Sequence, residues 1–352
     1  MVEWKKLGEV CEVLRGKRLT KSQLNETEGY PVLHGGSTPM GYYSDYNRKA
    51  NTTVVVNTGN AGSVFFYDKE FWSSDACFSL YPNKGIIDKY LYLYVYGCEK
   101  ILKGKIRAGA MPTIDANAVA SLIIPIPSLE EQERIVGILD TFTASIDNIK
   151  AQIEQRRKQY EHYRNTLLTF NKDDESVEWK TLGEIGEISA GGDVPRNTIK
   201  ETNPIENYCF PVYSNGKENN SLYGYSTSYS IAKQAVTISA RGTIGWHCVR
   251  EAYFTPIIRL ITVIPNEKLL SAKYLDYALY VTRIGGDNGG IPQLTVPSIK
   301  NCEIPLPSLQ EQQRIVSILD TFEASINNLE AQLEQRQKQY EYYREELLTN
   351  LS

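Results

Sequence analysis

Few residues of this chain have the type and spacing that catalysis requires. The three histidines, His34, His162 and His247, show neither the HExxH pattern nor the Cys/His spacing of a zinc site. The six cysteines form no CxxC pair, and the chain has no GxSxG nucleophile elbow and no GxxxxGK[ST] phosphate loop. Asn203-Pro204-Ile205 stops short of the NPPY-type tetrad of amino-methyltransferases, and no FxGxG cofactor loop occurs. These observations predict a non-catalytic chain that holds no metal and no cofactor.

Basic side chains offer a different chemistry, the binding of phosphate groups. Two clusters stand out, one around Gly16 and one around Gly104. Their members are Arg15, Lys17, Arg18 and Lys21, and Lys100, Lys103, Lys105 and Arg107. The chain as a whole carries a formal net charge of −4, so it is not the basic body of a simple nucleic-acid binder. A DNA surface is therefore expected to be local, or shared with a partner.

Two short glycine motifs follow β-branched runs. They are Gly59-Asn60-Ala61-Gly62 and Gly242-Thr243-Ile244-Gly245, and both predict tight loops after strands. A GxxG at such a place serves a β-turn more often than a ligand, although a ligand contact stays open.

The elements that must position these loops are built twice. The segment from Pro125 to Thr169 and the segment from Pro305 to Thr349 are identical at about 32 of roughly 45 aligned positions. A shorter echo relates Glu3-Trp4-Lys5-Lys6-Leu7-Gly8-Glu9 to Glu178-Trp179-Lys180-Thr181-Leu182-Gly183-Glu184. Between these shared ends the two halves agree only in scattered places. The repeated segments, which we call the frame, are nearly constant, while the sequence between them, the variable filling, differs. This predicts a protein that engages something with two halves.

Each long repeat contains a heptad seam and predicts a helix of about 60 Å. The two seams most simply pair with each other as an antiparallel intramolecular coiled coil that spaces the two halves. Ser128 and Ser308 are the expected N-caps, with Glu131 and Glu311 completing capping boxes. Arg156 and Arg336 interrupt the seams at equivalent places and either fix the register or lie in surface salt bridges. The seam residues are Ile135, Leu139, Phe142, Ile146, Ile149 and Ile153 in the first helix, and Ile315, Leu319, Phe322, Ile326, Leu329 and Leu333 in the second.

The variable filling predicts an α+β fold with mixed, β-rich domains. Runs such as 53–56, 63–67, 235–238 and 260–264 are β-branched or aromatic and predict short strands, whereas 88–96 and 272–280 favour helices. We therefore predict a first variable domain at 1–124, a central helix at 125–172, a second variable domain at 173–304 and a C-terminal helix at 305–352. The 352 residues, 41% hydrophobic and 23% charged, suffice for two cores. No apolar leader or run of roughly 18 apolar residues is present, which predicts a cytoplasmic protein.

The framework segments resemble those of the specificity subunits of type I restriction-modification enzymes. The resemblance rests on the Trp4 and Trp179 segments and on "IPIPSLEEQERIVGILD" with its partner "IPLPSLQEQQRIVSILD", and it covers essentially the whole chain. It implies two target-recognition domains that each read one half of a bipartite DNA sequence, with a coiled coil that sets the spacer. It also implies two methyltransferase subunits docked on the constant regions and a restriction subunit, so that S-adenosylmethionine, ATP and Mg²⁺ belong to partners.

With this resemblance, base and phosphate contacts are expected from basic residues of the variable loops. The expected DNA-binding residues are Lys17, Arg18, Lys103, Lys105, Arg107, Arg196, Lys217 and Arg241. Two other classes of function stay open from the residues alone. One is a coiled-coil scaffold that joins two protein partners without touching DNA, and the other is an enzyme whose motif is not recognisable.

Overall fold

The computed structural model describes residues 2–36, 38–107, 109–282, 284 and 293–349. It forms two compact units, one comprising Met1–Ala151 with Glu330–Ser352 and the other Gln152–Leu329. Each unit therefore contains one variable domain together with parts of both long helices. The boundaries of the four parts expected from the sequence remain a prediction, because this grouping by contacts divides the chain differently.

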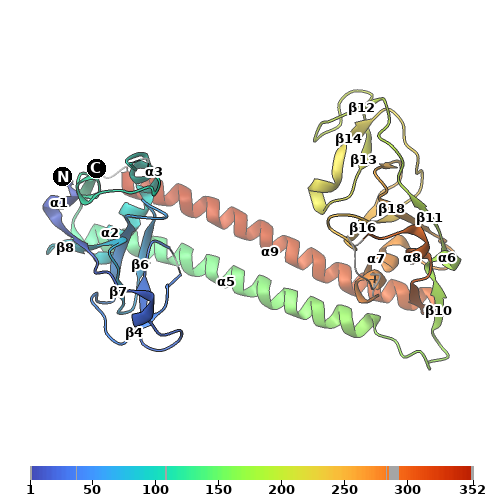
Figure 1. The fold of residues 1–352 in the computed structure, drawn as a ribbon, viewed down its shortest axis with the longest axis horizontal. Helices are drawn as coiled ribbons and strands as arrows, with labels where there is room; N and C mark the ends of the chain where they lie inside the picture. Colours follow the sequence, from blue (N-terminus) through green and yellow to red (C-terminus); the bar gives the residue numbers. More distant parts are fainter. Residues whose placement is uncertain (1, 37, 108, 283, 285–292, 350–352) are drawn as a thin grey trace. The chain divides into compact units, whose positions relative to one another are not determined.

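The first half of the chain begins with framework and sheet elements in the order shown in Figure 1. These are β1 (Glu3–Lys6), α1 (Leu7–Val10), β2 (Cys11–Arg15), a 3₁₀ turn (Lys21–Gln23), β3 (Tyr30–Leu33), β4 (Tyr42–Tyr43), β5 (Thr52–Val56), β6 (Val64–Tyr67), β7 (Trp72–Ser73) and β8 (Cys77–Pro82). Helical elements follow, namely α2 (Asp88–Gly97), α3 (Glu99–Gly104) and α4 (Ala116–Ala120), then β9 (Ile123–Ile126) and the long helix α5 (Leu129–Leu168).

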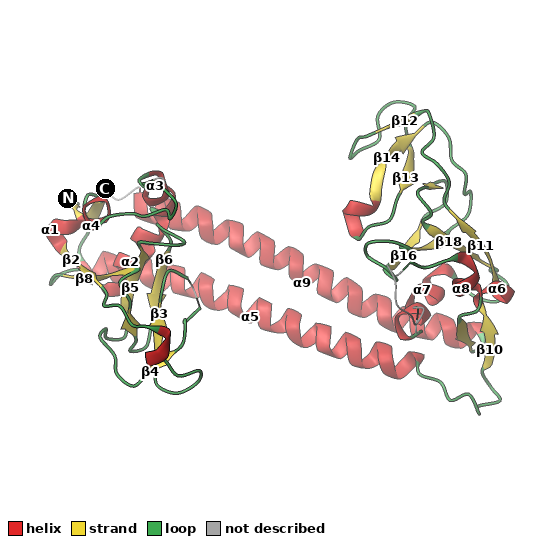
Figure 2. Ribbon diagram, in the orientation of Figure 1, coloured by secondary structure: helices red, strands yellow, loops and turns green. Residues whose placement is uncertain are grey.

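The second half of the chain has a related series of elements. It comprises β10 (Glu178–Thr181), α6 (Leu182–Ile185), β11 (Gly186–Ala190), β12 (Thr198–Ile199), β13 (Phe210–Tyr213), a 3₁₀ turn (Glu218–Ser221), β14 (Leu222–Ser226), β15 (Ala235–Ile238), β16 (His247–Arg250), β17 (Thr255–Pro256), β18 (Ile261–Pro265), α7 (Ala272–Val281), α8 (Val296–Lys300), β19 (Glu303–Leu306) and α9 (Leu309–Thr349). The strands and helices predicted in the variable filling are confirmed, and the fold is α+β with β-rich domains, as Figure 2 shows.

Each variable domain is organised around an equivalent four-stranded antiparallel sheet. The strand order is β2-β8-β5-β6 in the first domain and β11-β18-β15-β16 in the second. A smaller sheet accompanies each, β4-β3-β7 and β12-β14-β13-β17. The strands β5 and β15, predicted from their β-branched runs, are buried along their whole length and lie at the centre of the larger sheets. The sheets are thus the rigid parts from which the variable loops project.

The repeated framework segments pair with each other inside each unit. Strand β1 lies antiparallel to β9 with Trp4 opposite Pro125, and β10 lies antiparallel to β19 with Trp179 opposite Pro305. These two-stranded ribbons lead directly into α5 and α9. The duplication of the sequence is therefore a duplication of one structural frame, which brings the start of a domain to the start of its long helix.

The long helices pack antiparallel within each unit. In the first unit the rings of Phe142 and Tyr343 stack with centroids 5.3 Å apart, and in the second the rings of Tyr163 and Phe322 do so at 5.2 Å. The guanidinium of Arg336 lies 5.6 Å from the Phe142 ring centroid, and that of Arg156 lies 5.8 Å from that of Phe322. Both seam arginines thus cover an aromatic ring of the facing helix by cation–π contact.

The seam residues differ in where they pack. Ile146, Ile149 and Ile153 are buried, whereas Phe142, Phe322, Ile326, Leu329 and Leu333 are partly buried. The first two positions of each seam belong to the cores of the domains, because Ile135 and Leu139 pack with α2 and β9, and Ile315 and Leu319 pack with α7 and β19. Each domain is therefore joined to the beginning of a long helix by continuous apolar packing.

The capping of the long helices differs in part from the expectation. Ser128 Oγ accepts the Glu131 N–H at 3.2 Å, as expected of an N-cap. The Glu131 carboxylate, however, binds the Arg134 guanidinium through two hydrogen bonds of 2.7 and 2.6 Å, and Glu311 binds Arg314 in the same way. A bidentate pair with a guanidinium outcompetes the backbone N–H for the carboxylate.

Candidate nucleic-acid interface

The variable loops gather at one end of each larger sheet, which we call its loop end. In the first domain this is the end at Arg15, Val56 and Cys77, since Val56 pairs with Cys77 and Arg15 with Phe78. In the second domain Ala190 and Ile238 both pair with Ile261, so the chain leaves β11 and β15 and enters β18 at the same end. Each GxxG motif lies in the loop at this end, and all four glycines of the two motifs have positive φ between 69 and 89°. The predicted tight loops are confirmed, and the glycines are required by backbone conformation.

Lys17 and Arg18 lie at the loop end of the first domain. The Lys17 N–H donates to Ser73 O at 2.8 Å, and its carbonyl accepts the Trp72 indole N–H at 2.7 Å. Gly16 permits this close approach, because a Cβ there would lie 2.0 Å from Ser74 O. The backbone is thereby fixed while both basic side chains stay exposed, and neither has a carboxylate partner in the part of the chain that the structure describes.

The predicted cluster at Lys103, Lys105 and Arg107 is largely neutralised. Lys103 Nζ lies 2.7 Å from the Glu99 carboxylate, and the Arg107 guanidinium forms a 2.5 Å ion pair with Asp115. Lys105 Nζ donates to Ser121 Oγ at 2.7 Å.

This cluster nevertheless adjoins the loop end. A Cβ on Gly62 would lie 3.1 Å from the Lys103 side chain. The backbone of Thr113 forms isolated β-bridges with both Arg107 and Thr58. The sequence showed the charges in this region but not the carboxylates that fold back against them.

In the second domain, the segments that carry Lys217 and Arg241 are joined by the side chain of Asn215, a contact that we call the clamp. The Asn215 side chain accepts the Ala240 N–H at 2.7 Å, and so holds the loop of Arg241 against the segment that leads to Lys217. Arg241 donates to Gln293 Oε1 at 3.3 Å, and the Lys217 side chain is exposed. Arg196 is also exposed and lies between β11 and β12, but no contact joins it to this clamp among the described residues.

Sequence reasoning passed over Ile258 and Arg259, which enter β18 at the same loop end. Their only signal in the sequence is a bulky apolar residue next to an arginine after Thr255-Pro256, and this pattern is common in strands. The positive φ of both residues, 53 and 61°, becomes visible only in the structure.

Other arginines are engaged internally. Arg250 donates to Thr237 Oγ1 and Ser221 Oγ and lies 3.8 Å from the Tyr213 ring centroid. Arg48 donates to Ser79 Oγ and to backbone carbonyls, and burial lowers its pKa from the ordinary value. These two arginines stabilise the domains and are not available to a ligand.

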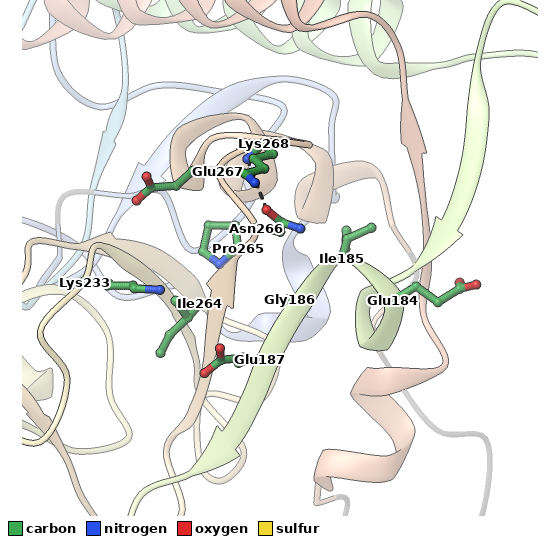
Figure 3. A pocket seen from close by; sticks show the side chains of 10 residues that line it. All are labelled: Glu184, Ile185, Gly186, Glu187, Lys233, Ile264, Pro265, Asn266, Glu267 and Lys268. Atoms are coloured by element: carbon green, nitrogen blue, oxygen red, sulfur yellow. Dashed lines mark hydrogen bonds between the residues drawn. The ribbon is translucent and has the colours of Figure 1, made fainter.

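The opposite end of the second sheet has a different charge. Figure 3 shows the depression there, whose lining includes Glu184, Glu187 and Glu267 together with Lys233 and Lys268. It lies at the Gly186 and Pro265 ends of β11 and β18, which pair with each other. An excess of carboxylates repels phosphate, so this end of the sheet is an unfavourable face for a polyanion.

In the described ranges no three His, Cys, Asp or Glu residues approach one another as a metal site would require. All six cysteines are free thiols. None of the described helices is both long and apolar enough to cross a membrane.

Comparison with known proteins places the chain in a family. The type I restriction modification DNA specificity domain matches residues 1–156 and 175–337. A putative type I specificity subunit of Mycoplasma pneumoniae is 30% identical and covers 97% of this chain and 96% of its own length. The specificity subunit of an Escherichia coli type I restriction enzyme is 30% identical, with 99% of this chain and 94% of the relative covered.

Solved structures agree on the fold. The S subunit of a type I restriction-modification system from M. genitalium superposes with a TM-score of 0.68 at 18% identity, covering 100% of this chain and 97% of that one. These relatives are specificity subunits, which accords with a chain in which no catalytic motif was found, and they favour DNA specificity over a pure scaffold. The chain belongs to the family of type I restriction-modification DNA specificity subunits.

Proposed function

We propose that this subunit reads a split DNA target, with each recognition domain reading one half at the loop end of its larger sheet. The observation that carries the proposal is the contrast between equivalent sheets and unlike loops. Lys17 and Arg18 occupy the loop end of the first domain, and Arg241 and Arg259 occupy that of the second. Equivalent scaffolds with different side chains at one end suit the reading of two different half-sites.

In this proposal the long helices set the unread spacer. Helix α5 runs unbroken over 40 residues and α9 over 41 residues. Each domain is packed on the beginning of one helix, so a domain cannot slide along it without disrupting its own core. A rigid attachment of this kind supports a fixed number of base pairs between the half-sites.

The constant frame is the proposed docking surface for partners. Two methyltransferase subunits would bind the framework strands and long helices, one to each unit, and a restriction subunit would complete the complex. Exposed side chains on the frame, such as Trp4 at 50% exposure and Leu129 at 52%, support such a contact. S-adenosylmethionine, ATP and Mg²⁺ would be held by those partners, in the cytoplasm.

The test is to purify this chain with its methyltransferase partner and to map the modified adenines on a library of random DNA duplexes by single-molecule sequencing. We expect one motif in two parts with a fixed spacer. Modification of DNA without a motif, or a motif that is unchanged when one recognition domain is replaced, would contradict the proposal. A complex that forms but shows no sequence preference would point to the scaffold.

A further inference from the structure

The turn that enters β18 in the second domain holds two consecutive residues in the left-handed region. Ile258 has φ 53° and Arg259 has φ 61°, and this region is unfavourable for a β-branched residue such as isoleucine. The turn is nevertheless exposed, with Ile258 at 44%. Burial of the isoleucine therefore does not explain why the domain maintains this conformation.

The surrounding backbone enforces the turn. The Ile258 N–H donates to Gly192 O at 2.8 Å, and the Arg259 N–H donates to Gly191 O at 2.9 Å. A Cβ on Gly191 would lie 2.6 Å from Ile257 N, so only glycine allows the two segments to approach. These hydrogen bonds hold the turn against the segment that follows β11, while the side chains of Ile258 and Arg259 stay exposed.

The Asn215 side chain joins this turn to the Arg241 loop. Its Nδ2 donates to Ile258 O at 2.8 Å, while its Oδ1 accepts the Ala240 N–H at 2.7 Å. Both loops are consequently held in one arrangement before any ligand binds. Such preorganisation is what a recognition surface needs, because the loops lose little further freedom on binding.

The equivalent turn of the first domain lacks these features. The pairing of Arg15 with Phe78 and of Ala190 with Ile261 aligns Asp75 with Ile258 and Ala76 with Arg259. Neither Asp75 nor Ala76 has a positive φ. The same carbonyl is clamped by an asparagine in both domains, since Asn57 Nδ2 donates to Asp75 O at 3.1 Å. The hydrogen bond from an asparagine to this carbonyl is common to both domains. The positive φ values and the exposed side chains occur only in the turn of the second domain.

The side chains at this place are of the types that read bases. An arginine binds O6 and N7 of guanine through two hydrogen bonds, and an apolar side chain packs on the methyl group of thymine. Neither Arg241 nor Arg259 has a carboxylate partner among the described residues. Neither guanidinium group is therefore neutralised, and Arg259 is exposed at the loop end.

We propose that the Ile258–Arg259 turn is a base-reading element, in which Arg259 binds a guanine of the second half-site and Ile258 packs on a thymine methyl of a neighbouring base pair. This inference rests on the proposed function, because it assumes that the second domain reads one half of a split target. The bases are read in the major groove, where guanine and thymine present these groups.

The experiment compares the wild-type complex with the variants R259Q, I258G and K233A on a library of random duplexes, with modified adenines mapped by sequencing. R259Q should lose about 10- to 100-fold of its preference for one guanine in the second half-site and leave the first half-site unchanged. Glycine tolerates a positive φ, so I258G keeps the turn. It should, however, reduce the preference for thymine at one position of the second half-site. K233A removes a cation from the opposite end of the sheet and should change neither half-site.

The possible failures are distinguishable. If R259Q keeps the wild-type motif, or weakens modification equally at all sequences as loss of a phosphate contact would, Arg259 does not read a base and the inference is overturned while the proposed function stands. If R259Q relaxes the first half-site, the assignment of the turn to the second half-site is wrong. If the wild-type complex itself shows no split motif, the proposed function and this inference fail together.

Discussion

The buried side chain of Gln132 accepts a hydrogen bond from the backbone N–H of Ile87 at 2.9 Å, and so ties the start of α5 to the start of α2. Its Nε2 donates to Gly85 O at 2.9 Å and to Pro127 O at 3.0 Å. In the second unit Gln312 keeps both donor bonds, to Leu269 O and Pro307 O. Its buried Oε1, however, has no hydrogen-bond partner in the described part of the chain.

This difference predicts unequal costs for the same substitution. Q132L leaves the Ile87 N–H and two carbonyl oxygens without their partner, and each unpaired buried group costs about 1–3 kcal/mol. Q312L leaves two carbonyls unpaired but also removes an unpaired acceptor. We expect the free energy of unfolding to fall by about 1 kcal/mol more for Q132L than for Q312L, measured by urea denaturation. An equal or reversed loss would show that the Ile87 contact contributes nothing.

These glutamines also show what the sequence could and could not reveal. The duplication, the heptad period and the β-branched runs predicted the frame, because period and propensity are local properties. The role of Gln132 was not predictable, since a polar residue in the first turn of a surface helix ordinarily faces solvent. Two of its three partners, Ile87 and Gly85, lie 45 and 47 residues away and are brought near only by the completed fold.

The candidate site divides in the same way. Lys17, Arg18 and Arg241 were predictable because basic residues next to glycine turns are visible in the sequence. The neutralisation of Lys103 and Arg107 was not, since Arg107 meets Asp115 only after the chain folds back. The strained turn at Arg259 leaves no mark in the sequence, because a left-handed conformation at a residue other than glycine has no compositional signature.

A second prediction concerns a buried hydrogen bond between a histidine and a carboxylate in the second domain. His247 Nδ1 lies 2.8 Å from the Asp276 carboxylate, and the side chains are 6% and 10% exposed. The equivalent positions of the first unit, the first residue of β6 and the fifth of α2, are Val64 and Tyr92. H247V should destabilise the protein by about 2–4 kcal/mol, because it leaves the Asp276 carboxylate buried without its partner.

The double variant H247V/D276L is the control for this pair. It removes the orphaned carboxylate together with the histidine, so its loss of stability should be smaller than the sum of the two single losses. A double-mutant cycle measured by thermal unfolding gives the coupling directly. Strict additivity would mean that the two side chains do not interact, contrary to their geometry.

A third prediction follows from the thiols. Burial raises the pKa of Cys98 to about 11 and that of Cys11 to about 12, whereas Cys209 is exposed. Because the thiolate is the reactive form, an alkylating reagent at neutral pH should modify Cys209 well before Cys98 or Cys11, as mass spectrometry of peptides would show. Rapid labelling of Cys98 in the folded protein would contradict its burial.

The raised pKa of Cys98 also makes stability depend on pH. An unfolded thiol releases its proton near its ordinary pKa of 9.0, while the folded thiol keeps its proton up to about 11. The contribution to stability is therefore fully present below about pH 9 and is lost as the pH rises to about 11. C98A should show a shallower fall of unfolding free energy over this range than the wild type. Parallel curves would show that Cys98 does not titrate differently in the two states.

A fourth prediction separates free cations from paired ones in the first domain. Lys17 and Arg18 are exposed without a carboxylate partner among the described residues, so each can release a counterion from DNA on binding. K17Q/R18Q should weaken DNA binding by the methyltransferase complex and reduce the slope of log Kd against log salt by about 2. Fluorescence anisotropy over a series of salt concentrations measures both quantities.

The double variant E99Q/K103Q provides the matched comparison, because it removes an ion pair and leaves the net charge unchanged. The amide oxygen that E99Q introduces can still accept the hydrogen bond that the Val64 N–H donates to Glu99 at 2.8 Å, so the local fold is retained. Lys103 must break its 2.7 Å pair with Glu99 before it can contact phosphate, and its removal should therefore change the salt slope by less than about 1. If E99Q/K103Q lowers the slope as much as K17Q/R18Q does, Lys103 exchanges Glu99 for a phosphate on binding, and the paired cluster belongs to the interface after all.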